Sequence, residues 1–296
     1  MPAHPPFGPL PPPETPSPEP QLMMRISEAE FQALRTLISH HFGIHLTDEK
    51  KNLVVGRLQK HLRQQGFTSF REYHDHLIGR LDRSELDSLV NAISTNYSYF
   101  YREEKHFQYL LNVALPALTG NPGERRNREL RIWSAGCSTG EEPYLLVMLL
   151  MEFFKLEYSL WDAGVLATDI SSRVLQIARE AVYEQERIYK LPLPYRQQYF
   201  TGLADGRVKV KDTVRREVTF RRFNLMNHDF PFRKPFHIIF CRNVMIYFDQ
   251  PTREALLERF YRFLLPGGYL FIGHSETLGR ERAGFRFLIP ACYQRL

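Results

Sequence analysis

Apolar residues recur at helical spacing between residues 24 and 95 and in short strand-like runs over the rest of the chain. Stripes of side chains three and four residues apart predict amphipathic helices, so the first region is expected to be a small all-helical domain. Ser27, with Glu30 three residues later, marks the start of its first helix, and Gly66 marks the end of its second. The stripes are Phe31, Leu34, Leu37 and Ile38; Val54, Val55, Leu58 and Leu62; and Leu86, Leu89, Val90 and Ile93.

Residues 96–296 alternate between short apolar strands and helices. This alternation predicts an α/β domain with a doubly wound, mostly parallel sheet and right-handed crossovers. Ligands of such sheets bind at the carboxyl ends of the strands. The predicted strands are 130–134, 164–168, 236–241 and 269–272, and the predicted helices are 142–154, 172–180 and 250–265.

The stretch at 183–223 is too long for a single crossover between two strands. It holds an alternating segment at 207–211, a second β-rich run at 217–220 and a turn at 204–206. We predict an inserted antiparallel β-subdomain here, and its second β-rich run is a candidate to rejoin the main sheet.

Residues 1–23 differ from both domains in composition. Ten of the chain's twenty prolines lie within residues 1–20, and the sizeable apolar side chains there are Phe7 and Leu10. A segment with so little to pack is expected to be a disordered, extended tail. A docking motif for a proline-reading module is the alternative.

The composition excludes a disordered chain but decides little about function. The chain has 39 Lys and Arg against 33 Asp and Glu, a net charge of +6, and 43% hydrophobic residues, as in an ordinary globular protein. Three widely spaced cysteines form neither a disulfide framework nor a zinc site, which favours a reducing cytoplasm. The longest apolar run, at 144–154, is shorter than the roughly 20 residues of a membrane span. The N-terminus lacks the pattern of a secretory signal.

The strongest local signal is a strand that enters a small-residue loop and then a helix, with the sequence IWSAGCSTGEEPY at 132–144. The loop lacks the Lys–Ser/Thr pair of a Walker loop, and Glu141 and Glu142 would repel a triphosphate. A cationic or zwitterionic cofactor such as S-adenosylmethionine suits the loop better, with Asp169 after the next strand as the acid for ribose hydroxyls. The alternative is that Glu141 and Asp169 only cap the helices that follow them.

Four groups of residues occur in a specific order along the chain: TN at 95–96 ahead of FYR at 100–102, WSA at 133–135 with GEEPY at 140–144, FCRNVMIYF at 240–248, and GHSE at 273–276. Together they resemble the CheR family of chemotaxis methyltransferases, and the likeness covers roughly residues 24–296. That family joins a small helical domain to a class I methyltransferase domain that carries an inserted β-subdomain.

The resemblance implies that S-adenosyl-L-methionine donates its methyl group to γ-carboxylates of glutamates on the cytoplasmic helices of chemoreceptors. The products are glutamyl methyl esters and S-adenosyl-L-homocysteine. Arg102, whose planar fork of donors suits a carboxylate, and Tyr247, as a second wall of the transfer pocket, are the candidate catalytic residues. Carried over by motif, the cofactor site comprises Asn96, Ser98, Arg102, Glu142, Asp169, Asn224, Leu225, Arg242 and Asn243.

The chemistry implied by the resemblance needs no general base. A glutamate carboxylate has an ordinary pKa of about 4.3 and is ionised at neutral pH, so the reaction is expected to depend on alignment. His274 is therefore expected to be hydrogen-bonded in the core or at the pocket edge. Two features depart from the family: Ser98 replaces a Thr, and the loop at 201–207 looks shorter than in relatives that dock a peptide from the receptor's C-terminus.

The predicted second helix, at about 49–65, has a basic face opposite its apolar stripe. Its basic residues are Lys50, Arg57, Lys60 and His61. The resemblance implies that Lys50, Arg57 and Lys60 meet the acidic methylation region of the receptor's helical bundle, whereas an ordinary solvated face is the alternative.

Two other functions fit parts of the sequence. An NAD-dependent oxidoreductase also places an acid after the second strand, but the GxGxxG motif is missing. A non-catalytic nucleic-acid-binding protein would need a recognition helix or aromatic stacking platforms, and the basic face is short for that role. We therefore expect neither nucleic acid nor membrane insertion among the interactions of the chain.

Overall fold

The computed structural model describes residues 24–79, 83–94, 96–120, 127–279 and 282–296. The predicted Pro-rich tail at 1–23 lies outside the described residues. Within the described ranges, no helix combines the length and the apolar content needed to cross a membrane.

The N-terminal region is the expected small helical domain. Ser27 accepts a hydrogen bond from the Glu30 N–H while the Glu30 carboxylate accepts one from the Ser27 N–H, so the capping box forms as predicted. Gly66 takes a left-handed φ of 85° after the second helix. The helices are α1 (Glu28–Phe42), α2 (Lys51–Gln64), α3 (Phe70–Gly79) and α4 (Arg83–Ile93), and a 3₁₀ turn, η1 (Asp48–Lys50), precedes α2.

The larger domain is built on a seven-stranded sheet of order β6-β2-β1-β7-β8-β10-β9. The first five strands in this order run parallel, and β10 is antiparallel to both β8 and β9. The predicted doubly wound, mostly parallel sheet is therefore confirmed, and a C-terminal antiparallel hairpin is added to it. The strands are β1 (Ile132–Ala135), β2 (Val165–Asp169), β6 (Val218–Arg222), β7 (Phe236–Cys241), β8 (Leu264–Ile272), β9 (Phe285–Ile289) and β10 (Cys292–Arg295).

Helices cover both faces of this sheet, because its central strands are apolar on both sides. Ile238 and Phe240 of β7 pack into the core that contains α5 and α8, whereas Ile239 packs with Leu256 and Phe260 of α12 on the opposite face. The helices of this domain are α5 (Glu104–Tyr109), η2 (Leu110–Ala114), α6 (Leu115–Thr119), α8 (Glu141–Phe154), η3 (Lys155–Leu160), α9 (Ser172–Glu180), η5 (Met245–Tyr247) and α12 (Gln250–Phe263).

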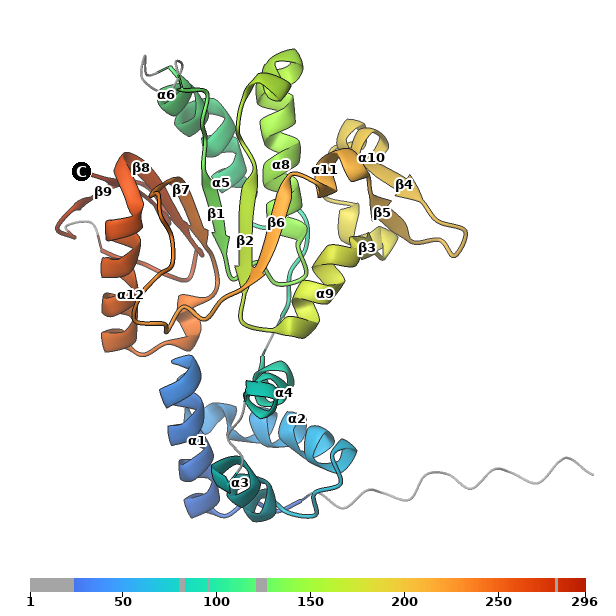
Figure 1. The fold of residues 1–296 in the computed structure, drawn as a ribbon, viewed down its shortest axis with the longest axis vertical. Helices are drawn as coiled ribbons and strands as arrows, with labels where there is room; N and C mark the ends of the chain where they lie inside the picture. The colour runs from blue at the N-terminus through green and yellow to red at the C-terminus, as the bar shows by residue number, and fades with distance from the viewer. Residues whose placement is uncertain (1–23, 80–82, 95, 121–126, 280–281) are drawn as a thin grey trace, which may run out of the picture.

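The predicted insertion at 183–223 divides into two parts. A three-stranded antiparallel sheet of order β3-β5-β4 lies beside α9, at the right of Figure 1, whereas β6 joins the edge of the main sheet next to β2. The loop between β4 and β5 is a tight turn, closed by a hydrogen bond of 2.8 Å from Leu203 N to Arg207 O. The subdomain contains β3 (Val182–Tyr183), η4 (Gln185–Ile188), α10 (Leu193–Tyr199), β4 (Phe200–Gly202), β5 (Val208–Val210) and α11 (Asp212–Arg215).

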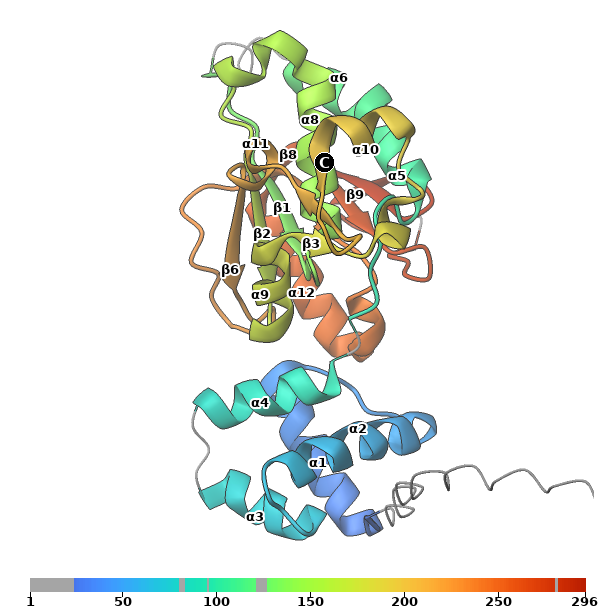
Figure 2. The same ribbon diagram turned by 90° about the vertical axis from the view of Figure 1, so that its right-hand side faces the viewer.

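The helical domain lies against the carboxyl ends of the parallel strands, below the sheet in Figures 1 and 2. The Asn224 amide, just after β6, donates to His41 O at 2.7 Å, and His45 N donates to Tyr247 O at 2.7 Å. Ile44 also forms an antiparallel bridge with Phe248. These contacts place the end of α1 at the edge of the sheet where a ligand is expected.

Candidate active site

A pocket lies between the two domains at the carboxyl ends of the strands. Phe42, which ends α1, and Ile44, just after it, contribute to its wall, as do helices α4, α5 and α8. The rest of the wall comes from the linker between α4 and α5 and from the loops after β1, β2, β6 and β7. Every residue that the sequence placed at the cofactor site lines this pocket, and so does Tyr247: the set is Asn96, Ser98, Arg102, Glu142, Asp169, Asn224, Leu225, Arg242, Asn243 and Tyr247.

The loop after β1 requires glycine at both of its ends. Gly136 has a φ of 87°, and a Cβ on it would lie 2.4 Å from Val244 Cγ2. Gly140 has a φ of 96°, and a Cβ on it would lie 2.9 Å from Ala178 Cβ. Larger residues are strained at both positions, so glycine lets the loop follow the pocket wall closely.

Asp169 is the last residue of β2. It holds in place the loop at 136–140 after β1, called the glycine loop below. Its Oδ2 accepts a hydrogen bond from Ser138 N at 2.9 Å, and its Oδ1 accepts one from Ser171 N at 2.9 Å. Burial raises the pKa of Asp169, against the effect of these N–H donors. The N-cap of α9 is Ser171, whose hydroxyl accepts from Val174 N, so capping that helix is not the role of Asp169.

Glu142 is joined to β1 and to the loop after β7. Its Oε1 accepts a hydrogen bond from Ser134 Oγ at 2.7 Å, and its Oε2 accepts from Arg242 Nη1 at 3.0 Å. Burial raises the pKa of Glu142, although Arg242 and Ser134 act in the opposite direction. A positively charged ligand in this pocket would stabilise the ionised forms of Glu142 and Asp169.

The neighbouring Glu141 turns away from the pocket and does not cap α8. It is fully buried and pairs with Arg187 at 2.6 Å, while Thr139 Oγ1 donates to it at 2.7 Å. Arg187 also donates to Ser98 O at 3.0 Å. Glu141 therefore ties the β-subdomain to the linker, a role that the sequence did not indicate.

The linker before α5 supplies donors to the pocket. The Asn96 amide nitrogen is buried and has no hydrogen-bond partner among the described residues. Arg102 donates from Nη1 to Tyr97 O at 2.9 Å, which anchors one end of its guanidinium beside the pocket. A ligand with carboxylate or hydroxyl oxygens fits these donors, as an amino-acid or ribose group would.

Several residues named from the sequence lie away from the pocket. His274 is exposed and is not among the lining residues. On α2, Lys60 is exposed, whereas Arg57 is half-buried and donates to Ile93 O at 3.0 Å. Lys50 lies in η1, one residue before α2.

Two glutamates that support the site were missed as functional residues. Glu276 accepts from the backbone N–H groups of Gly273, Asn243 and Ile246. Glu103 accepts from Arg242 and Asn243. Glu276 is the last residue of the GHSE motif, and Glu103 directly follows the FYR motif. Their position in or next to these motifs is the signal that could have identified them.

A doubly wound sheet with a glycine loop after its first strand and a buried acid at the end of its second suits a cofactor that carries a ribose, as S-adenosylmethionine and NAD both do. The family model described as "CheR methyltransferase, SAM binding domain" matches residues 96–290, and "CheR methyltransferase, all-alpha domain" matches residues 29–94. The chain belongs to the CheR family. Its methyl donor is S-adenosyl-L-methionine, so the alternative prediction of an NAD-dependent oxidoreductase was wrong.

Curated relatives carry the name "Chemotaxis protein methyltransferase". The protein from Borreliella burgdorferi is 42% identical over 274 residues, covering 93% of this chain and 96% of its own. The Escherichia coli protein is 38% identical over 265 residues, covering 88% of this chain and 89% of its own. "Chemotaxis protein methyltransferase 2" of Pseudomonas aeruginosa is 40% identical, covering 84% of this chain and 86% of its own. The chain is thus a methyltransferase of the chemotaxis type.

Proposed function

We propose that this protein methylates the γ-carboxylates of glutamates on the cytoplasmic helices of chemoreceptors, in the cytoplasm, and releases glutamyl methyl esters and S-adenosyl-L-homocysteine. The observation that carries the proposal is the absence of a general base among the described residues of the pocket wall, which contains neither His nor Lys. Its carboxylates are engaged, Glu142 by Arg242 and Asp169 by two backbone N–H groups. An acceptor that is already ionised, as a glutamate is at neutral pH, fits such a site.

Cys137 also lines the pocket but does not serve as a base or nucleophile. Burial raises the pKa of its thiol well above the ordinary value, and the nearby carboxylates of Asp169 and Glu142 act in the same direction. The thiol therefore stays protonated at neutral pH, which leaves the substrate carboxylate as the nucleophile.

S-adenosyl-L-methionine supplies an electrophilic methyl group on a sulfonium. We assign Glu142 to its amino-acid end, Asp169 to the ribose hydroxyls, and Asn224 with Leu225 to the adenine edge, because these residues follow successive strand ends along one pocket. Arg102 aligns carboxylate oxygens at the transfer point, and Tyr247 forms the opposite wall. Alignment of two bound partners can lower a barrier by roughly 7–11 kcal/mol, which suits a site without acid–base groups.

The proposed reaction is tested with S-adenosylmethionine labelled in its methyl group and a purified cytoplasmic fragment of a chemoreceptor. We expect label in the receptor that mild alkali releases as methanol, because carboxylate methyl esters hydrolyse in base. Receptor glutamates changed to aspartate at the labelled positions are the control, since the shorter side chain withdraws the carboxylate from the pocket. Label that survives alkali would contradict esterification.

We further propose that η1 and α2 dock the acidic receptor bundle through Lys50, Arg57 and Lys60. Arg57 also bonds Ile93 O, so its reversal would damage the domain itself, and the sharper variant is Lys50→Glu with Lys60→Glu. We expect a several-fold higher receptor KM at about 50 mM salt and an unchanged cofactor Kd. This difference should shrink at about 500 mM salt, because exposed charges are screened within a Debye length of about 10 Å at 0.1 M.

The matched control for this charge reversal is Lys105→Glu with Lys155→Glu. Both lysines are exposed and lie on the sheet domain, so net charge changes equally without touching α2. If the two double variants have the same receptor KM, receptor recognition lies elsewhere than on α2.

A further inference from the structure

Glu103 stands at the point where the pocket linker enters α5, in an unusual backbone conformation. It occupies the N-cap position of α5 with φ 59° and ψ 58°, and its side chain makes no capping bond to that helix. Tyr101, two residues earlier, also has a positive φ of 66°. Left-handed conformations are unfavourable for such side chains, so contacts elsewhere must hold this loop.

Those contacts come from two other segments of the chain. Glu103 Oε2 accepts from Arg242 Nη2 at 3.1 Å and from Arg242 Nε at 3.3 Å, in the loop after β7. Its Oε1 accepts from Asn243 Nδ2 at 3.2 Å and from the backbone N–H of His274, after β8, at 3.3 Å. One carboxylate, with a side chain only 12% exposed, therefore joins three loops around the pocket.

The contacts of Arg242 show how the Glu103 carboxylate affects the pocket. The guanidinium is 3% exposed and lies between two carboxylates, with Glu103 on one side and Glu142 at 3.0 Å on the other. Arg102 O also accepts from Arg242 Nη2. A planar guanidinium is fixed in direction when both ends are bonded, so Glu103 keeps Arg242 aimed at Glu142.

Asn243 is held in the same way. Its backbone has a left-handed φ of 58°, its N–H donates to Glu276 Oε2 at 3.1 Å, and its side chain donates to Glu103. The positions of two pocket residues, Arg242 and Asn243, thus depend on the Glu103 carboxylate.

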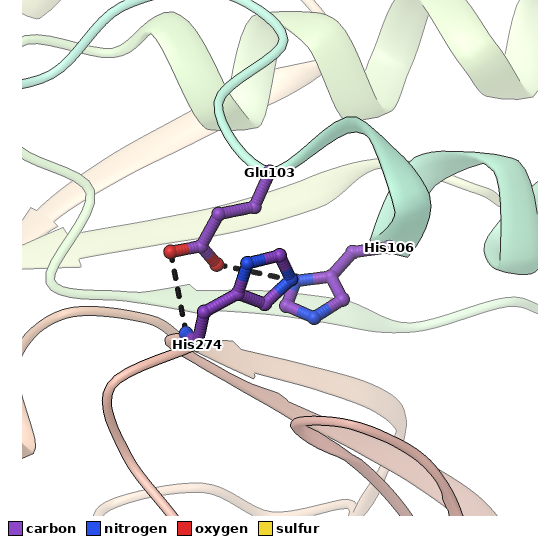
Figure 3. Close-up of side chains that lie close together, drawn as sticks. All are labelled: Glu103, His106 and His274. Carbon is purple, nitrogen blue, oxygen red and sulfur yellow. Dashed lines mark hydrogen bonds and ion pairs between the residues drawn. The ribbon is translucent and has the colours of Figure 1, made fainter.

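Glu103 also belongs to a cluster of side chains that could hold a metal ion. Figure 3 shows His106 and His274 next to its carboxylate, and the ligand atoms of the three residues lie within 4.8 Å of one another. His106 is fully buried, and its Nδ1 lies 3.5 Å from Glu103 Oε2. Burial, with the positive charge of Arg242, lowers the pKa of His106 to about 4, so its ring is neutral.

The bonds of Glu103 argue against that metal ion. Both of its oxygens already accept hydrogen bonds, and Arg242 places a positive charge 3.1 Å from Oε2. A divalent cation would have to displace Arg242 and then lie close to its charge. The neutral His106 ring instead packs edge-on against His274, with ring centroids 4.7 Å apart.

We propose that Glu103 is a positioning residue for methyl transfer: its carboxylate holds Arg242 and Asn243 in the orientation that the cofactor pocket requires. This inference rests on the cofactor roles assigned to Glu142 and Arg242. Burial acts to raise the pKa of Glu103, but the charge of Arg242 together with the hydrogen bonds from Asn243, the His274 N–H and Arg242 lowers it, so the carboxylate is charged at neutral pH.

The test is a double-mutant cycle read by calorimetric titration with S-adenosyl-L-homocysteine, which needs no receptor. Glu103→Gln should weaken binding about tenfold, the scale of one charge-assisted hydrogen bond. Arg242→Gln should weaken it at least as much. The double variant should lose less than the sum of the two single losses, because Glu103 acts in part through Arg242 and in part through Asn243. In turnover, Glu103→Gln should raise the KM for S-adenosylmethionine more than it lowers kcat.

Controls separate this role from simple stabilisation. Glu104→Gln changes an exposed neighbour that accepts a hydrogen bond from Gln108, so this variant should bind like the wild type. Glu103→Asp keeps the charge but shortens the reach, so it should also bind more weakly, and it serves if Glu103→Gln does not fold. Wild-type affinity in Glu103→Asp, or losses that add fully in the double variant, would overturn the proposal.

Two further outcomes are informative. If Arg242→Gln binds S-adenosyl-L-homocysteine normally, the assigned cofactor site is wrong, whereas a loss in Arg242→Gln with none in Glu103→Gln refutes only the positioning role. A wild-type protein that loses affinity after treatment with a chelator, and recovers it with Zn²⁺, would overturn the proposal in favour of a metal site.

Discussion

Arg102→Ala is expected to lower kcat by about 100-fold or more while raising the cofactor Kd only a few-fold. Loss of one preorganised donor at a reacting oxygen costs on the order of 10²–10³ in kcat in other enzymes, and Arg102 is the proposed donor to the carboxylate at the transfer point. One end of its guanidinium is anchored on Tyr97 O at 2.9 Å. The remaining N–H groups of the fork can then be directed at the carboxylate without a further loss of side-chain freedom.

The measurement is steady-state methylation of a receptor fragment, paired with calorimetric titration of the cofactor product. Arg102→Lys should rescue poorly, because an ammonium is a point charge and cannot make a two-pronged contact. Arg173→Ala, an exposed arginine on α9, is the matched control and should retain full turnover. Full activity in Arg102→Lys would show that charge alone suffices at this position.

Asp169→Ala is expected to weaken binding of S-adenosyl-L-methionine by roughly 1–3 kcal/mol, about 5- to 150-fold in Kd. The ribose hydroxyls would lose a charged acceptor. The N–H groups of Ser138 and Ser171, each 2.9 Å from the carboxylate, would also lose their partner, so the glycine loop would lose its support. Calorimetric titration below the melting temperature of the variant separates weaker binding from unfolding.

Asp169→Asn distinguishes these two contributions. The amide keeps an oxygen for one of the two serine N–H groups but removes the charge, so loop support is partly retained while the ribose contact weakens. Asp162→Ala, an exposed aspartate just before β2, should bind as the wild type does. Unchanged affinity in Asp169→Ala would place the ribose elsewhere in the pocket.

The sequence predicted those elements whose boundaries are determined locally. Strand β7 at 236–241 and helix α9 at 172–180 have the predicted bounds, because the first is a continuous apolar run and the second begins after the Ser171 cap. Helix α12 ends at Phe263, two residues earlier than predicted, because Leu264 already enters β8. Strands β9 and β10 were missed, since their polar residues dilute the pattern and pairing with β8 defines them.

The residues of the candidate site likewise divide into those that the sequence predicted and those that depend on distant contacts. Residues at the carboxyl ends of strands, such as Asp169, were predictable because the topology of a doubly wound sheet places these ends together. The role of Glu103 was not, because it depends on Arg242, 139 positions further along the chain, and on an unusual backbone turn. The hydrophobic periodicity of the sequence does not indicate a contact between residues so far apart.

Phe42 and Ile44, at the end of α1, form part of the pocket wall, and the Asn224 side chain reaches back to His41 O. Replacing the helical domain with that of a relative would therefore also change part of the wall of the cofactor pocket, besides any change in receptor preference. The helical domain that carries the proposed receptor-docking residues thus also supplies part of the wall of the cofactor pocket. We expect chimaeras that exchange the domains at the linker to need compensating changes at Phe42 and Ile44, whereas the contact of Asn224 with residue 41 uses a backbone oxygen that any residue provides.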